Sequence, residues 1–190
     1  MNKTYRITMI AIMAAICYVG FAFLQIKIPT PAGFTSFHMG NVFCALASLM
    51  FGGVSGGLAG AIGMTIGDLF DPSYVITAPK TFILKFFIGY ITGSIAHKVF
   101  HIDKKKGKDL FVATLISVSC GMLFNIIGEP LISYLYYGLL LNNSDKALSY
   151  LTIAKWITTS VNSLVAIIVS TLLYVPLSSR LSAINNKNNQ

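Results

Sequence analysis

The sequence predicts an all-α, polytopic membrane protein with six transmembrane helices. Of its 190 residues, 55% are hydrophobic and only 11% are charged, and the mean hydropathy is +0.72. Soluble proteins average about 25% charged residues. The formal net charge of +8 comes from Lys and Arg residues that gather at segment ends and in one short loop. It therefore indicates membrane topology and excludes a basic nucleic-acid-binding face.

The six expected helices follow from apolar segments, because a spanning helix needs about 20 mostly apolar residues. The first segment is too long for a cleavable signal and lacks a cleavage site. Gly52-Gly53 separates the short second and third segments, which we expect to form a tight hairpin. The last two are long enough to tilt or kink. The six segments, within one membrane domain spanning 1–190, are 5–25, 39–53, 54–70, 80–99, 109–137 and 152–178.

The connecting loops predict the orientation. An even number of helices places both termini on one side, and Lys104, Lys105, Lys106 and Lys108 mark the loop that shares this side. Cytoplasmic loops accumulate Lys and Arg, so both termini are expected in the cytoplasm of a bacterial cell. Residues 25–37, with two prolines and a glycine, are expected to form an ordered, extended lid on the outside.

Polar residues interrupt three apolar helices near their expected outer ends. Asn125 and Glu129 are four residues apart and share a helix face. A charge at membrane depth is costly and usually marks a functional site, so we predict a ligand site that opens outward. The candidate ligand contacts are Lys80, Lys85, Asn125, Glu129, Lys155, Trp156, Thr159 and Asn162, together with His38 and Asn41 beside the lid.

Structural alternatives remain for several of these residues. Glu129 could pair with Lys85 or Lys155 only to hold helices together, although buried pairs contribute little net stability. Trp156 is equally compatible with an interfacial membrane anchor, and His38 with a simple hydrogen-bonding residue. Asp68, within an apolar segment, is a candidate acceptor for a buried lysine.

No motif in the sequence predicts catalysis. Cys17, Cys44 and Cys120 lack the spacing of a metal site or a disulfide framework, and no nucleophile is accompanied by a suitable base. We therefore expect no cofactor, no metal and no enzymatic activity in this chain. Ala11 and Ala15 are four residues apart in the first helix. Such small residues allow close helix approach, either within the chain or to a partner helix.

The chain resembles the substrate-binding S components of energy-coupling factor (ECF) vitamin importers. Within that family it looks closest to the members for riboflavin, hydroxymethylpyrimidine or pyridoxine. The residues that carry the resemblance are Ala11-xxx-Ala15, the runs His38 to Val42, Phe51 to Gly57 and Ala78 to Lys85, and Gly89 with Gly93.

The resemblance implies a subunit that binds one vitamin beneath the first loop, using helices four to six. It also implies docking, through helices one to three, onto a transmembrane coupling subunit associated with two ATPase subunits. Ala11 and Ala15 match the docking motif of helix one. Toppling of the subunit among the membrane lipids, driven by ATP, would expose the pocket inward.

The expected substrate is a vitamin with a pyridoxine-like or hydroxymethylpyrimidine-like ring, whose hydroxyls and nitrogen suit the lysines, Glu129 and Asn162. Riboflavin and pantothenate remain alternatives, since the lysines also suit the carboxylate of pantothenate. Two hypotheses from other classes are a self-contained secondary carrier and a membrane enzyme. The carrier is disfavoured because the sequence has no internal repeat and the inner halves of the last three helices offer no continuous polar path.

Overall fold

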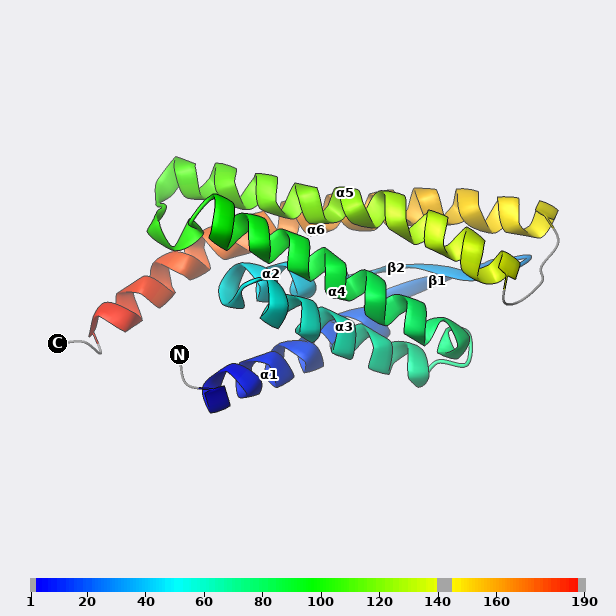
Figure 1. Ribbon diagram of the computed structural model, residues 1–190, viewed down its shortest axis with the longest axis horizontal. Coiled ribbons are helices and arrows are strands. Elements are labelled where there is room, and N and C mark those ends of the chain that lie inside the picture. The colour runs from blue at the N-terminus through cyan, green and yellow to red at the C-terminus, as the bar shows by residue number, and fades with distance from the viewer. Residues whose placement is uncertain (1–2, 140–144, 188–190) are drawn as a thin grey trace.

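The computed structural model describes residues 3–139 and 145–187, with side chains to residue 178 (Figure 1). It contains the six predicted helices and one antiparallel hairpin. Short turns of 3-10 or π-helix, η1 to η3, lie at Val75–Thr77, Ile95–Val99 and Ile102–Lys104. The main elements are α1 (Lys3–Ala22), β1 (Gln25–Thr30), β2 (Gly33–His38), α2 (Gly40–Phe51), α3 (Gly53–Leu69), α4 (Ala78–Ser94), α5 (Gly107–Leu139) and α6 (Asp145–Lys187).

The helices differ in their capacity to cross a membrane. In the described part of the chain, four stretches are long and apolar enough: Lys3–Ala22, Val75–Val99, Gly107–Leu139 and Asp145–Ser178. Helix α2 has 12 residues and α3 has 17. At 1.5 Å per residue α2 is about 18 Å long, shorter than the roughly 30 Å hydrocarbon core. The six helices are confirmed, whereas six complete spans remain a prediction.

Glycines set the close packing of α2, α3 and α4. Gly52 joins α2 to α3 with φ of 84°, a conformation that favours glycine, and this junction confirms the expected tight hairpin. Between α3 and α4, a Cβ atom at Gly89 would lie 2.6 Å from the Cα of Gly57. The two backbones can approach this closely only because both residues lack a side chain.

The lid predicted at residues 25–37 is the β1–β2 hairpin, paired from Gln25 with His38 to Thr30 with Gly33. Its second strand is fastened to α6. The Oγ1 atoms of Thr35 and Thr158 lie 2.6 Å apart in a hydrogen bond. The side-chain amide of Asn162 accepts from the backbone N–H of His38 at 3.1 Å and donates to the carbonyl of Ser36 at 2.9 Å.

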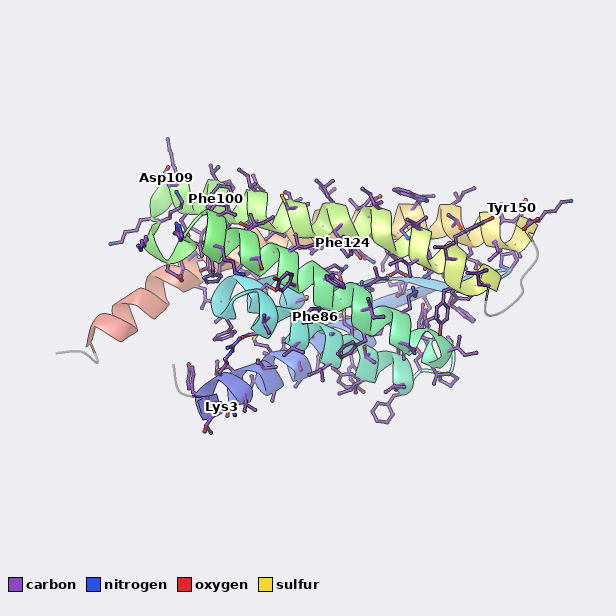
Figure 2. The ribbon with its side chains drawn as sticks, in the orientation of Figure 1. Lys3, Phe86, Phe100, Asp109, Phe124 and Tyr150 are labelled. Atoms are coloured by element: carbon purple, nitrogen blue, oxygen red, sulfur yellow. The ribbon has the colours of Figure 1, made fainter. Side chains whose placement is uncertain are left out.

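The two ends of the molecule are chemically different. Both termini and the α4–α5 connection lie at one end, and the hairpin and the α3–α4 connection lie at the other (Figure 1). Figure 2 shows Lys3, Phe100 and Asp109 at the first end and Tyr150 at the second. We call these the terminal end and the hairpin end. The arrangement places the lysine-rich connection of residues 104–108 on the same side as the termini, as the even helix count predicts.

Thiol labelling tests the orientation of these ends. With the native cysteines replaced, a cysteine at Lys105 at the terminal end should resist a membrane-impermeant maleimide in intact cells. A cysteine at Lys146, near the start of α6, should react. The physical reason is the retention of positively charged loops in the cytoplasm. Labelling in the reverse pattern would contradict the orientation, and lysed cells provide the control for intrinsic reactivity.

Candidate ligand-binding site

A polar cavity lies beneath the hairpin, where the ends of several helices converge. Its empty volume is about 480 Å³, part of which is open to solvent. The hairpin lies over it, α2 contributes its first turn and α3 its last, α4 contributes its first half, and α5 and α6 contribute residues from within their length. The lining residues are Phe21, Thr35, Ser36, His38, Asn41, Asp68, Tyr74, Thr77, Lys80, Thr81, Lys85, Asn125, Glu129, Lys155, Thr159 and Asn162.

All the ligand contacts predicted from the sequence except Trp156 line this one cavity. They come from four helices and the hairpin, and the sequence separates the first of them from the last by more than a hundred residues. Trp156 is 42% exposed and lies outside the cavity. Its position therefore does not support the prediction that Trp156 contacts a ligand.

Glu129 is the centre of a buried charge network. Its Oε1 accepts from Lys80 Nζ at 2.5 Å and from Lys155 Nζ at 2.9 Å. Ser133, one turn after Glu129 on α5, also belongs to this network. Its hydroxyl donates to Glu129 Oε1 at 3.2 Å and accepts from Lys80 Nζ at 3.0 Å. The side chains of Lys80 and Lys155 are 3% and 7% exposed, so both ammonium groups are buried.

This network corrects one pairing and confirms another. The sequence offered Lys85 or Lys155 as the partner of Glu129, and the structure gives Lys80 and Lys155. Glu129 was considered either as a ligand contact or as a link between helices. Its carboxylate does link α4, α5 and α6, and the residue also forms part of the cavity wall.

Lys85 is held differently. Its ammonium is buried, with the residue 5% exposed, and its described hydrogen bond is to Asn125 Oδ1 at 3.5 Å. Asn125 in turn donates to Ser163 Oγ at 3.2 Å. Among the described residues no carboxylate lies within ion-pairing distance of Lys85. A buried ammonium with one long hydrogen bond retains donors that are free to engage a ligand.

Several other polar atoms in the cavity wall lack partners in the described residues. Both polar atoms of the Asn41 side chain, His38 Nδ1 and one carboxylate oxygen of Asp68, Oδ2, have no hydrogen bond. Asn41 and Asp68 are each 1% exposed. Most buried polar groups in folded proteins are hydrogen-bonded, and leaving one unpaired costs about 1–3 kcal/mol. The cluster therefore has unused capacity to bind a polar molecule.

Asp68 is a cavity residue that the predicted contacts omitted. The sequence marked Asp68 as a charge inside an apolar segment and as a candidate acceptor for a buried lysine. In the described part of the chain Asp68 makes no ion pair with a lysine. The last turn of α3 places Asp68 in the cavity wall, and the connection formed by residues 70–77 adds Tyr74 and Thr77. Only the tertiary structure shows that the end of α3 reaches the same space as α5 and α6.

Aromatic rings form one side of the cavity. Phe21 meets the imidazole of His38 edge to face, with ring centroids 4.8 Å apart, and lies 6.4 Å from the ring of Tyr74. Burial lowers the pKa of His38 to about 3, and the nearby Lys85 and Lys155 add to this effect against the opposing charge of Glu129. The imidazole is therefore neutral, and this wall offers apolar area with one neutral polar edge.

An ion pair fastens the outer edge of the hairpin. Lys27 on β1 bonds Asp71 in the α3–α4 connection, with Nζ 2.5 Å from Oδ2. Partial burial tends to raise the pKa of Asp71, but hydrogen bonds and the charge of Lys27 lower it overall. With its folded pKa below the ordinary Asp value of about 3.9, the carboxylate stabilises the pair at neutral pH. This contribution is lost as pH falls through that lowered pKa.

We therefore expect Lys27→Met to accelerate release of a bound ligand without disrupting the cavity. An exposed pair contributes at most about 1 kcal/mol, which corresponds to about fivefold in rate. In the wild-type protein, this contribution should not change between pH 5 and 8. Stopped-flow release measured on wild type, Lys27→Met and Asp71→Asn checks both points. A release rate in Lys27→Met equal to wild type would contradict the role of the pair.

The predicted docking residues lie away from this site. Ala11 and Ala15 are exposed, whereas the buried side of α1 is formed by Met13, Ala14 and Cys17. Packing within the chain was the alternative role for the two alanines, and the structure does not place them in such a contact. They are two small residues on an exposed face of α1 that also carries larger apolar side chains, Ile7, Ile12, Ile16 and Val19.

The cavity combines charged, polar and aromatic groups. Within the described residues, no group of three or more His, Cys, Asp or Glu side chains could hold a metal ion. What the cavity presents is lysine ammonium groups, two carboxylates, three asparagine amides and an aromatic wall. This combination can orient a small polar molecule by hydrogen bonds and exclude water from it.

Comparison with known proteins gives the family. Residues 1–179 match the family described as "ECF-type riboflavin transporter, S component". A solved structure titled "Structure and mechanism of the S component of a bacterial ECF transporter" has the same fold, with a TM-score of 0.59 and 21% identity, covering 95% of this chain and 99% of that one.

A curated relative from Pyrococcus woesei, "Uncharacterized protein in gap 3'region", is 25% identical over 116 residues, which are 60% of this chain and 70% of that protein. The family match extends over nearly the whole chain, and it confirms the resemblance derived from the sequence. This protein belongs to the family of S components of ECF-type transporters.

Proposed function

We propose that the protein captures one water-soluble vitamin in the cavity beneath the β1–β2 hairpin and delivers it to an ECF transport complex. The observation that carries this proposal is the set of buried, unpartnered polar atoms at Asn41, His38 and Asp68 in the cavity wall. A cavity maintained only for packing would gain nothing from such atoms, whereas a polar ligand would satisfy them.

The proposed vitamin has a single substituted ring of the pyridoxine or hydroxymethylpyrimidine type. Its hydroxyl groups and ring nitrogen would find donors at Lys85 and both donors and acceptors at Asn41 and Asn125. Its faces would lie against Phe21 and Tyr74, which take the role first considered for Trp156. Riboflavin is the second candidate because the matching family is described by that vitamin.

Energy for transport is proposed to come from partner subunits. In this proposal, the exposed face of α1 that contains Ala11 and Ala15 docks on a transmembrane coupling subunit, and two ATPase subunits drive the cycle. The subunit would lie in the bacterial plasma membrane with the terminal end in the cytoplasm and the hairpin end outside. Small residues at Ala11 and Ala15 would let a partner helix approach closely.

Copurification tests the binding function directly. The protein is purified in detergent from cells grown in rich medium, denatured, and the released small molecules are analysed by mass spectrometry. We expect one vitamin at close to one equivalent. The absence of any bound small molecule, combined with no binding of pyridoxine, hydroxymethylpyrimidine, riboflavin or pantothenate by equilibrium dialysis, would contradict the proposal.

A further inference from the structure

The charges that line the cavity do not balance. Three lysines and two acidic residues face it: Lys80, Lys85, Lys155, Glu129 and Asp68. With every group ionised the lining carries one excess positive charge, because the neutral imidazole of His38 adds none. Any protonation of Asp68 would increase the excess. An excess charge among buried side chains is unfavourable unless an opposite charge is supplied.

The ion pairs distinguish one of the three lysines from the other two. Lys80 and Lys155 share the carboxylate of Glu129 at 2.5 and 2.9 Å. Asp68, the other acid, forms no ion pair within 4.0 Å in the described part of the chain, and its Oδ2 has no hydrogen bond. Lys85 has only the amide oxygen of Asn125, at 3.5 Å. It is therefore the one lysine of the cavity wall that makes no direct ion pair in the described part of the chain.

The surroundings of Lys85 suit an anion bound in a defined direction. Lys85 extends from the middle of α4, and Asn125 of α5 is fixed beside it through Ser163 of α6. Asn41, in the first turn of α2, lines the same cavity, and its side-chain amide has no hydrogen bond in the described part of the chain. An ammonium and a neutral amide donor together can bind one oxyanion with charge-assisted hydrogen bonds, which are stronger than neutral ones.

We infer that Lys85 binds an oxyanion of the ligand, so that the captured vitamin carries a carboxylate or an ionised ring hydroxyl. This inference rests on the proposed function of the cavity and narrows it to one chemical class. Pantothenate, a carboxylate, belongs to this class, and so does pyridoxine, which at neutral pH is mainly a zwitterion with an ionised ring hydroxyl and a protonated ring nitrogen. Riboflavin and hydroxymethylpyrimidine carry no ionised oxygen at that pH and do not belong to it.

Matched ligand pairs test the inference on the wild-type protein. One pair is pyridoxine and 3-O-methylpyridoxine, in which methylation prevents ionisation. The other is pantothenate and pantothenol, in which an alcohol replaces the carboxylate. Dissociation constants at pH 7.5 are measured by equilibrium dialysis, with riboflavin and hydroxymethylpyrimidine as neutral probes. We expect the oxyanion member of at least one pair to bind tenfold or more tightly than its neutral counterpart and more tightly than both neutral probes.

Variants then test whether Lys85 is responsible for the preference for the oxyanion member of each pair. Lys85→Met retains the length of the side chain and should reduce the preference for the oxyanion member to less than threefold, while Lys85→Arg should retain it. Lys146→Met removes an exposed lysine outside the cavity and should leave the preference unchanged. If Lys85→Met does not fold, the wild-type comparison still decides the question.

The outcomes separate this inference from the proposed function. Tighter binding of riboflavin or hydroxymethylpyrimidine, or equal binding of both members of each pair, would overturn the oxyanion inference and leave vitamin capture intact. Loss of the preference in Lys146→Met to the same degree as in Lys85→Met would overturn the role of Lys85. No binding of any of the six compounds would overturn the proposed function, and this inference with it.

Discussion

Replacing Glu129 with Ala is expected to cause the largest loss of stability of any single change in the cavity. The substitution leaves Lys80 and Lys155 buried without the carboxylate that both contact. Removing one partner of a buried ion pair typically costs about 3–5 kcal/mol, because an uncompensated charge remains. The melting temperature of the detergent-purified protein should therefore fall markedly, with or without ligand.

A second substitution and a surface control make this result specific. Glu129→Ala combined with Lys155→Ala should recover part of the lost stability, since it removes one of the two stranded charges. Asp109→Ala removes an exposed carboxylate from the first turn of α5 and should cost no more than about 1 kcal/mol. A melting temperature for Glu129→Ala equal to that of Asp109→Ala would show that the network contributes little to the fold.

Trp substitutions at Ala11 and Ala15 are expected to abolish uptake while leaving binding intact. Two indole rings on the exposed face of α1 would prevent close approach of a partner helix, and neither position lines the cavity. We expect uptake of the copurified vitamin by cells to fall by tenfold or more. The dissociation constant of the isolated variant should stay within twofold of wild type.

The matched control places the same bulk on another lipid-accessible helix. Leu164 and Leu172 of α6 are 59% and 60% exposed, so Trp at these positions should change neither uptake nor affinity. Equal loss of uptake and affinity in the Ala11 and Ala15 variant would mean that the alanines support the fold of this subunit, and would contradict the docking surface.

Most of the fold was predictable because membrane helices follow from hydropathy. The six helices, the tight α2–α3 junction and the extended lid each had a local signal: apolar length, paired glycines, or prolines within a polar loop. Hydropathy could not show that α2 ends after 12 residues or that α6 continues to Lys187. Those boundaries depend on how far the helices of the packed bundle extend, which no local pattern determines.

The site was predictable as a set of residues but not as a network. Polar residues within apolar helices were predicted to contact a ligand because burying them without a partner is costly. All of the predicted contacts except Trp156 line the cavity. Which of these side chains pair with each other could not be predicted. The sequence shows which residues share a helix face but not how far apart the helices lie. This is why Lys85 was considered as a partner of Glu129, whereas Lys80 makes the contact.

Trp156 could have been excluded from the sequence. Lys155, Thr159 and Asn162 occupy positions i, i+4 and i+7 of one helix face, and all three line the cavity. Adjacent helical residues point about 100° apart, given 3.6 residues per turn, so a residue next to Lys155 cannot share that face. Phe21 carried no comparable signal, because an aromatic residue in an apolar helix has no feature that distinguishes cavity from core.

The most direct test of vitamin capture in this cavity is the affinity of Asn41→Ala for the copurified vitamin. The Asn41 residue is 1% exposed and its side chain makes no hydrogen bond within the described protein, so its removal breaks no internal hydrogen bond. We predict that the melting temperature of the empty protein stays unchanged or rises. Affinity should fall about tenfold, which corresponds to about 1.4 kcal/mol. A variant that binds the vitamin as tightly as wild type would contradict the account.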